Sequence, residues 1–470
     1  MILHSHITLN LDSLSTLGIL KKRIFCNEDE EFVKMISCWF PKLVLKADKT
    51  IIMEINRMKK HLALAAMLVL IVSRVMATDW PQYLGPDRNG ISMETGLKRS
   101  WSEDGPNVLW TFPLGEGFAG AAVSNGKVYV LDRVGNEQDV LRCIDLVTGK
   151  EGWTFAYDAP GKFERHGSRS VPTIEGNYIY TCGPLGHVHC IDKNTHKAVW
   201  KKNVWTDFGG GEVPTWGIPQ NPLIYGDLLI LASQTEKAGV VAYDKLTGSM
   251  QWASPALPGE PGYVSPKVIN IGGDDHLVMI SANGAVIGVE SKTGKVLWSY
   301  EGWQCKIPVP NVTEIGDGRI FITGGYKAGS AMIKVEKEGN VFVVRELYKT
   351  QEFGTHVHPA INYRGHLYGH CSTNDRQDGM VCMDFDGNVK WKTKRSPLFD
   401  KGGFILVDGL ILSIDGNKGF LYLIEPNPNG FKELASAKLL DTNQCWAPLA
   451  LSDGKLLIRD HKQMKCVVVR

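Results

Sequence analysis

The side chains best suited to ligand binding occur one to four positions before a recurrent position that is proline in six of eight repeats and phenylalanine, Phe404, after Lys401. They are Arg169, Gln220, Tyr263, Lys306, His356, His358, Lys401, Gln444 and Trp446. Cationic and amide groups hold carboxylate or phosphate oxygens through hydrogen bonds, and aromatic rings cover a flat or sugar-like face. We therefore expect a pocket for an unknown small molecule, anionic or sugar-like, or for a peptide segment of a protein. The alternative is an entrance of solvated polar residues that binds nothing, and no residue is assigned a catalytic role.

Two histidine pairs and one acidic segment have the residue types of a metal site. In His187-Val-His189 and His356-Val-His358, alternation along a strand would place both imidazoles on one face, which is compatible with zinc. Neither pair has a third ligand nearby in the sequence, so no metal is predicted. The segment 374–378 offers an amide and two carboxylates, the groups that calcium and a catalytic base require. We interpret it as a solvated turn between two strands.

A repeat must position these residues, because one phrase recurs along the chain. Its pattern is Ala/Cys-x-Asp-x-x-Thr-Gly-x-x-x-Trp, and variants of it end at Trp153, Trp200, Trp252, Trp298 and Trp391. The interval between the last two is about twice the usual one, so a unit near residue 345 is expected to lack its tryptophan. Self-similarity at a period of about 40–50 residues is typical of stacked repeats.

A second marker gives the number of units. A turn-forming X-Gly follows a short apolar run at Asn125-Gly126, Glu175-Gly176, Tyr225-Gly226, Gly272-Gly273, Asp317-Gly318, Arg364-Gly365, Asp408-Gly409 and Asp453-Gly454. Each is typical of a hairpin, and the later Asp-x-x-Thr-Gly makes a second turn, so each unit has four strands. These eight units predict an all-β, eight-bladed β-propeller over residues 107–470. An N-terminal strand at 107–112 is expected to complete the last blade.

The repeated tryptophans and cysteines are interpreted as structural. The tryptophans are expected to dock between neighbouring blades, and the set is Trp110, Trp153, Trp200, Trp252, Trp298 and Trp391. Cys143, Cys190, Cys382 and Cys466 share one repeat position, where other blades have alanine or glycine, so we expect small buried residues. Equivalent positions in different blades are too far apart for a disulfide, which predicts four free thiols.

The first part of the chain has the order of an export signal. Met58-Lys-Lys-His precedes an apolar run from Leu62 to Val72 and a small-residue end at Ala77. We predict a signal peptide at 58–77, an N-terminal segment at 78–106, and a periplasmic or secreted protein. Residues 1–57 precede this signal and are interpreted as a spurious extension from a start codon assigned too early. A genuine long extension is the alternative.

The charge balance limits the classes of partner. Lys and Arg total 52 against 50 for Asp and Glu, so the chain has almost no net positive charge to attract nucleic acid or a membrane surface. The apolar run of the signal is too short to span a bilayer. We therefore expect no nucleic-acid partner, no membrane span and a monomer.

The tryptophan-ending phrase resembles the docking repeat of pyrroloquinoline-quinone (PQQ) enzymes and of the PQQ-like propellers that lack this cofactor, which include the BamB lipoproteins. The resemblance covers roughly residues 107–470. The segment from Asp79 to Gly90 is also similar to the start of exported bacterial PQQ-like proteins, often labelled polyvinyl-alcohol dehydrogenase-like. Such a resemblance implies the fold but does not choose an activity.

A quinoprotein dehydrogenase would need PQQ, a calcium ion held by carboxylate and amide oxygens, and a carboxylate base. The resemblance to the well-known alcohol dehydrogenases of this type also implies a disulfide of adjacent cysteines, but the chain has no Cys-Cys pair and no Cys-x-x-Cys-His for a haem. BamB-like lipoproteins carry a lipidated cysteine, which is absent after the predicted cleavage point. We predict an exported binding or assembly module without a cofactor; the alternative is a PQQ- and calcium-dependent, polyvinyl-alcohol dehydrogenase-like enzyme.

Overall fold

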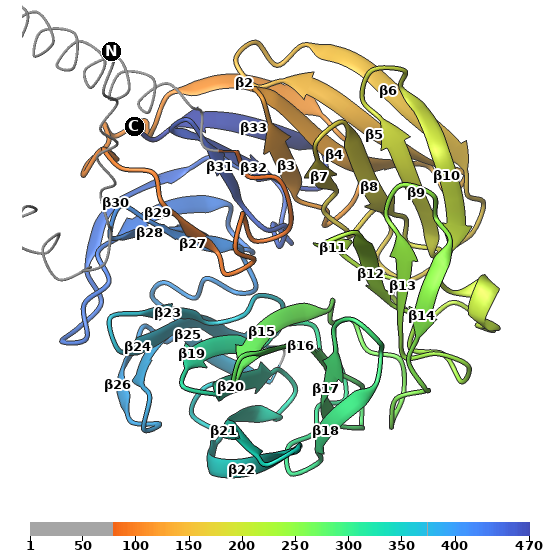
Figure 1. Cartoon of the computed structure of the whole chain (residues 1–470). Coiled ribbons are helices and arrows are strands. Elements are labelled where there is room, and N and C mark those ends of the chain that lie inside the picture. Colours follow the sequence, from red (N-terminus) through yellow and green to blue (C-terminus); the bar gives the residue numbers. More distant parts are fainter. Residues whose placement is uncertain (1–78, 374) are drawn as a thin grey trace, which may run out of the picture. The chain divides into compact units, whose positions relative to one another are not determined.

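Eight sheets of four antiparallel strands follow one another around a ring in the computed structural model, which describes residues 79–373 and 375–470 (Figure 1). The all-β, eight-bladed propeller predicted from the repeat is confirmed. The predicted extension and signal peptide lie outside the described residues. Within the part of the chain that is described, no helix is long and apolar enough to cross a membrane.

Each blade runs from an inner strand at the channel to an outer strand at the rim. In this order the blades consist of β3 Ala121–Ser124, β4 Lys127–Val134, β5 Gln138–Asp145 and β6 Glu151–Asp158; β7 Thr173–Glu175, β8 Tyr178–Cys182, β9 His187–Asp192 and β10 Lys197–Asn203; β11 Leu223–Tyr225, β12 Leu228–Ala232, β13 Val240–Asp244 and β14 Met250–Ala253; β15 Lys267–Ile271, β16 Asp274–Ile280, β17 Val286–Glu290 and β18 Val296–Tyr300; β19 Thr313–Gly316, β20 Arg319–Gly324, β21 Gly329–Glu338 and β22 Val341–Thr350; β23 Ile361–Tyr363, β24 His366–Thr373, β25 Arg376–Asp384 and β26 Val389–Lys392; β27 Phe404–Val407, β28 Leu410–Ile414, β29 Phe420–Ile424 and β30 Glu433–Lys438; β31 Ala450–Ser452, β32 Lys455–Arg459, β33 Gln463–Val468 and β2 Val108–Pro113. The short strand β1 Ile91–Ser92 pairs with β27 in parallel, and one 3-10 turn covers Thr206–Phe208.

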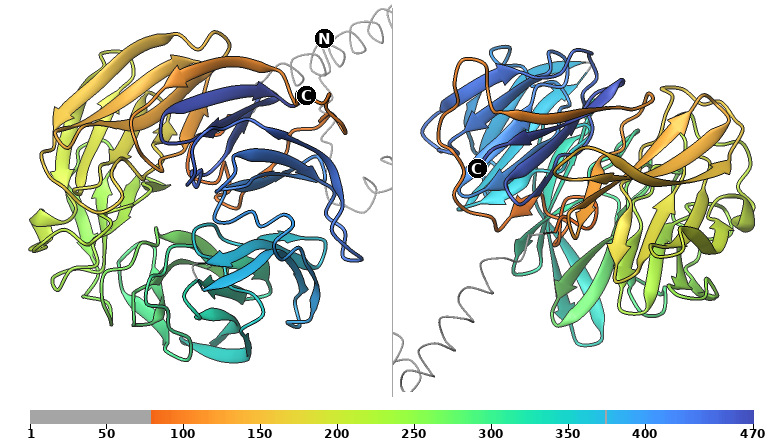
Figure 2. Two further views of the ribbon diagram at one scale, coloured as in Figure 1. Left: turned by 180° about the vertical axis from the view of Figure 1, so that it is seen from behind. Right: turned by 90° about the horizontal axis from the view of Figure 1, so that it is seen from above.

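The last blade is closed by a strand from the other end of the described chain. Strand β2 pairs with β33 in antiparallel register, with Trp110 opposite Cys466. Figure 2 shows this orange strand beside the dark blue C-terminal strands. Pairing of first and last strands leaves no open end to the ring, as the sequence predicted.

The repeat phrase is explained by how each tryptophan docks on the next blade. Trp110 Nε1 donates to the Leu146 carbonyl at 2.9 Å, and Trp200 Nε1 donates to the Lys245 carbonyl at 3.0 Å. Each acceptor lies in the Asp-x-x-Thr-Gly turn of the following blade. The aspartate shapes that turn, since Asp145 Oδ1 accepts the Thr148 backbone N–H at 2.9 Å. The small residue opposite each tryptophan, such as Cys466, leaves room for the ring.

The strand register shows which residues replace the tryptophan in the two blades that lack it. In the fifth blade Tyr348 lies opposite Met332, directly after the strand irregularity that precedes each docking tryptophan, so a smaller aromatic ring takes the position. The expected gap near residue 345 is therefore confirmed. In the seventh blade Ala435 occupies this position opposite Leu423. The eight described cysteines are all buried and unpaired, which includes the four expected free thiols.

Gly149 should tolerate substitution far less well than a turn glycine of similar backbone conformation. Both Gly149 and Gly126 have positive φ, at 69° and 70°. A Cβ on Gly149 would lie 2.5 Å from Trp110, whereas a Cβ on Gly126 would meet nothing within 4 Å. We expect Gly126→Ala to cost about 1 kcal/mol from backbone strain alone, and Gly149→Ala to cost about 1–3 kcal/mol more. Urea unfolding of both variants measures the difference, and equal costs would contradict the docking arrangement.

Candidate functional site

The inner strands of the blades begin at one level of the central channel. Pro172, Pro222 and Pro266 stand immediately before β7, β11 and β15, as the aligned prolines predicted. Proline cannot donate to a strand ladder, so it suits a strand start. The connections that lead into these strands therefore converge at one end of the channel.

The N-terminal segment crosses the channel and is held by blades far apart in the ring. Trp80 pairs with Val123 of the first blade, and the Arg88 guanidinium donates to the Asn221 and Pro222 carbonyls of the third blade at 3.2 and 3.0 Å. Strand β1 then pairs with β27 of the seventh blade. This path places Tyr83, which sequence reasoning did not assign to the site, against the channel residues.

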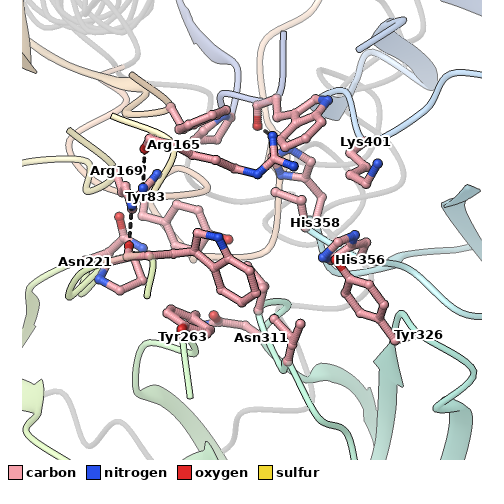
Figure 3. A pocket seen from close by; sticks show the side chains of 18 residues that line it. Tyr83, Arg165, Arg169, Asn221, Tyr263, Asn311, Tyr326, His356, His358 and Lys401 are labelled. Carbon is pink, nitrogen blue, oxygen red and sulfur yellow. Dashed lines mark hydrogen bonds between the residues drawn. The ribbon is translucent and has the colours of Figure 1, made fainter. Parts of the chain in front are cut away.

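A cavity of about 170 Å³, which we call the mouth pocket, lies where these connections meet (Figure 3). It is lined by Tyr83, Phe118, Arg165, Arg169, Trp216, Pro219, Asn221, Tyr263, Ile307, Val309, Asn311, Tyr326, His356, Val357, His358, Lys401, Trp446 and Pro448. No aspartate or glutamate is among these described residues. The wall thus combines cations, amides and aromatic rings.

Most of the residues singled out from the sequence lie in this wall. Arg169, Tyr263, His356, His358, Lys401 and Trp446 line the pocket. The other three do not line it. Lys306 is exposed, and Gln444 accepts a hydrogen bond from Arg165 at 2.9 Å at the rim. Gln220 is buried and joins two connections through the Val264 carbonyl and the Ala232 N–H, so its role is structural.

Arg169 has both structural and electrostatic importance. Its guanidinium donates to the backbone carbonyls of Trp216, Glu164 and Arg165, which fixes the connection that carries Arg165. Burial lowers the pKa of Arg169 to about 9, and its guanidinium carbon lies 5.3 Å from the Phe118 ring centre. A substitution of Arg169 would therefore disturb the loop as well as the charge.

The Trp446 indole is the centre of a second charged cluster in the wall. The Lys401 ammonium lies 4.7 Å and the Arg165 guanidinium 5.2 Å from Trp446 ring centres, both within the range of cation–π attraction. Asp400 accepts from Trp446 Nε1 at 2.8 Å and pairs with Lys401 at 3.0 Å. Arg165 is exposed and has no carboxylate partner among the described residues, so it is the cation most available to a ligand.

Three polar nitrogens of wall residues are buried and have no hydrogen-bond partner among the described residues. They are Trp216 Nε1, Asn311 Nδ2 and His356 Nδ1. The first two are donors only, and burial lowers the pKa of His356 to about 4, so its imidazole is neutral at neutral pH. An unpaired buried donor costs about 1–3 kcal/mol, which a ligand with acceptor oxygens would recover.

The neighbouring Asn221 amide differs from Asn311 because it is already used. Asn221 Oδ1 accepts the Val171 N–H at 2.7 Å, and its Nδ2 donates to Ser265 Oγ at 3.1 Å. These bonds join the connections of three successive blades. The pocket thus contains one amide that holds the fold and one whose Nδ2 has no partner.

The structure corrects the expectation for one of the two histidine pairs and agrees with it for the other. His356 and His358 lie in an irregular connection before β23, not on a strand, and His358 Nε2 contacts the Trp446 carbonyl at 2.9 Å. His187 and His189 do share a face of β9, where both contact the Tyr157 ring. Within the described residues no cluster of three potential metal ligands occurs.

The acidic segment expected to be a solvated turn is partly paired. Asp378 belongs to β25, pairs with Arg376 and lies 3.3 Å from Lys392 Nζ. Asn374 lies outside the described residues. The ion pairs leave Asp378 without the free carboxylate that calcium or base chemistry would require.

Sequence reasoning missed Tyr83, Arg165, Trp216, Asn311 and Tyr326. All five belong to irregular segments between strands or before the first blade, where no strand period indicates which side chain faces the channel. Asn311 directly follows Pro310, one of the aligned prolines, so this alignment was the one signal in the sequence that could have indicated Asn311. Tyr83 had none, because its segment stands outside the repeat.

Comparison with known proteins gives two kinds of relative. The chain is 24% identical over 175 residues to the glycerol dehydrogenase large subunit of Gluconobacter thailandicus, covering 32% of this chain and 24% of that subunit. It is 24% identical over 211 residues to the outer membrane protein assembly factor BamB of Shewanella oneidensis, covering 44% of this chain and 49% of BamB. The matches thus span about a quarter and about half of these relatives.

Solved structures show the same fold in both kinds of protein. BamB from Moraxella catarrhalis has a TM-score of 0.53 at 15% identity, covering 77% of this chain and 99% of that chain. The quinohemoprotein alcohol dehydrogenase from Comamonas testosteroni has a TM-score of 0.55 at 13% identity, covering 83% and 80%. At these identities the likeness concerns the fold alone.

A family model assigns the repeat directly. The model described as outer membrane protein assembly factor BamB matches residues 136–393, which is more than half of the chain. With its eight blades and its docking tryptophans, this chain belongs to the BamB-like family of PQQ-type propellers.

Proposed function

We propose that this propeller is a binding module whose mouth pocket holds a small carboxylate-bearing ligand with a flat apolar part. The observation that carries the proposal is the set of three unpartnered buried nitrogens, on Trp216, Asn311 and His356, in the wall of one pocket. Native proteins pair nearly all buried polar groups, so several unpaired ones around one cavity favour a bound partner.

The remaining wall supports the same ligand chemistry. Arg165 and Arg169 give the pocket positive charge without a carboxylate among the described lining residues, and Lys401 adds a cation that is paired with Asp400 behind the wall. Phe118 and Trp446 stack with ring centres 5.5 Å apart, presenting flat apolar surface beside the cations. Ring faces beside guanidinium groups suit a planar acid better than a neutral polyol.

The residues present do not fit the calcium–quinone pair of a quinoprotein dehydrogenase. The cations and rings could contact the carboxylates and the plane of PQQ. Calcium, however, prefers several carboxylate and carbonyl oxygens, and among the described lining side chains only Asn221 and Asn311 offer amide oxygens. Asn221 Oδ1 already accepts from Val171 N–H, and no lining carboxylate could serve as a base. The described wall therefore supports binding and no oxidation step.

Dehydrogenase activity is kept as a second candidate because a relative is a glycerol dehydrogenase subunit and several similar folds are quinohemoprotein dehydrogenases. The test is reconstitution of the purified chain with PQQ and calcium, followed by dye-linked oxidation of glycerol, ethanol and polyvinyl alcohol. We expect dye reduction no faster than in a protein-free control. Saturable reduction that requires both PQQ and calcium would reject the binding-module proposal in favour of the enzyme.

A further inference from the structure

A second cavity lies further along the inner strands, beyond the mouth pocket. This rear pocket has a volume of about 410 Å³ and is lined by Asp87, Arg88, Asn89, Ile91, Lys267, Val268, Thr313, Glu314, Ile315, Gly316, Pro359, Ala360 and Asn362. Its strand residues come from β15, β19 and β23, whereas the mouth pocket takes residues that precede β19 and β23. The N-terminal segment borders both cavities, through Tyr83 in one and Arg88 in the other.

Two buried cations, Arg88 and Lys267, form the inner wall of the rear pocket. Their exposed fractions are 4% and 7%, and neither forms an ion pair among the described residues. Lys267 Nζ donates to the Val312 carbonyl at 3.2 Å. The Arg88 Nη atoms donate to Gln82 Oε1 and to the Asn221 and Pro222 carbonyls, but its buried Nε has no partner among the described residues. Donors therefore remain on both side chains.

Other buried cations of the propeller differ in their partners. Arg133 pairs with Asp139 at 2.6 Å, although its Nε also lacks a partner among the described residues, and the Arg459 guanidinium donates to the carbonyls of Asp460, Ala119 and Gly115. Lys267 has only one acceptor in the described structure. The pKa of Lys267 is lowered to about 8, chiefly by burial; the Glu314 carboxylate opposes this shift, and the Arg88 charge adds to it. The rear pocket thus has two buried cations in its lining, and its two carboxylates, Asp87 and Glu314, are exposed and form no ion pair with them.

We propose that the rear pocket binds a small monocarboxylate, whose oxygens accept from Lys267 Nζ beside the positive charge of the Arg88 guanidinium. The exposed Asp87 and Glu314 line the same cavity, so a second negative charge on the ligand would be repelled. A positive charge on the ligand is tolerated for the same reason. The site therefore favours acetate or a zwitterionic carboxylate over a di- or tricarboxylate.

Reductive methylation of the full chain at pH 8 tests this site, with acetate, glycine betaine or citrate added at equal ionic strength. The extent of methylation at Lys267 and at the exposed turn residue Lys150 is read by peptide mass spectrometry. We expect saturating acetate or betaine to slow methylation of Lys267 by about tenfold and to leave Lys150 unchanged, because a bound carboxylate occupies the amine. Citrate should protect poorly.

Two variants test the selectivity of the rear pocket and its independence from the mouth pocket. Glu314→Gln should let citrate protect Lys267 better than it does in the wild type, since one of the two repelling charges is gone and only Asp87 remains. Asn311→Leu, in the mouth pocket, should leave acetate protection unchanged, which separates this site from the proposed function. Unprotected Lys267, equal protection of Lys267 and Lys150, or protection by citrate equal to that by acetate in the wild type would each overturn the proposal.

Discussion

Replacing Trp110 by alanine should lower the free energy of unfolding by about 3–5 kcal/mol, the range found for large buried aromatic side chains. The indole is 8% exposed and lies in the strand that closes the ring. Its removal would leave a cavity against Gly149 of the first blade and would break the bond from Nε1 to the Leu146 carbonyl. Both losses occur at the junction of the last and first blades.

The adjacent Leu109 provides the control on the same strand. Its side chain is 37% exposed, so Leu109→Ala should change the free energy of unfolding by no more than about 0.5 kcal/mol. Urea unfolding followed by tryptophan fluorescence and by far-UV circular dichroism measures both variants. Similar small effects for the two would show that closure by β2 contributes little to stability.

The fold could be predicted because each blade repeats the same turn residues, and most blades repeat the same docking tryptophan. The X-Gly hairpin at Asn125-Gly126 has positive φ at both residues, 51° and 70°, which the residue types indicate without tertiary information. The closing strand could be predicted because residues 107–112 contain a docking tryptophan, Trp110, but no other strands of a repeat precede them in the sequence. His196 shows a local exception, since it replaces the turn glycine at φ 58° and stacks on Trp153 at 4.4 Å.

The candidate site could be predicted only as far as the repeat extends. Arg169, Tyr263 and His356 were found because the aligned prolines placed their connections at one end of the channel. The path of the N-terminal segment, which brings Tyr83 and Arg88 into the channel, depends on tertiary contacts that no period encodes. Nor could the sequence separate Asn311 from Asn221, because the difference lies in which hydrogen bonds each amide makes.

Asn311→Leu should weaken ligand binding and leave the stability of the fold unchanged. Asn221→Leu should instead lower the stability of the fold. Removing Asn311 Nδ2 deletes a buried donor without a partner, so stability should be unchanged or slightly higher. Removing the Asn221 amide leaves the Val171 N–H without its partner, which should cost about 1–3 kcal/mol. For a carboxylate held by Asn311, the first variant should lose about 10- to 100-fold in affinity.

Thermal unfolding and calorimetric titration of both variants give the two readouts. A loss of stability in Asn311→Leu equal to that in Asn221→Leu would mean that Asn311 also supports the fold. Lys267→Met serves as a third variant, since Lys267 lines the rear pocket and not the mouth pocket, so this variant should bind a mouth-pocket ligand as the wild type does.

Calorimetric titration of the wild-type chain with benzoate, beside its neutral analogue benzamide, tests the central claim most directly. Both probes have the same flat ring, but only benzoate carries the charge that Arg165, Arg169 and Lys401 would hold. We predict that benzoate binds at least about tenfold more tightly than benzamide, that added salt weakens it, and that Asn311→Leu reduces it. Equal affinities of the two probes, or benzoate binding that Asn311→Leu leaves unchanged, would contradict the assignment of the mouth pocket as a carboxylate site.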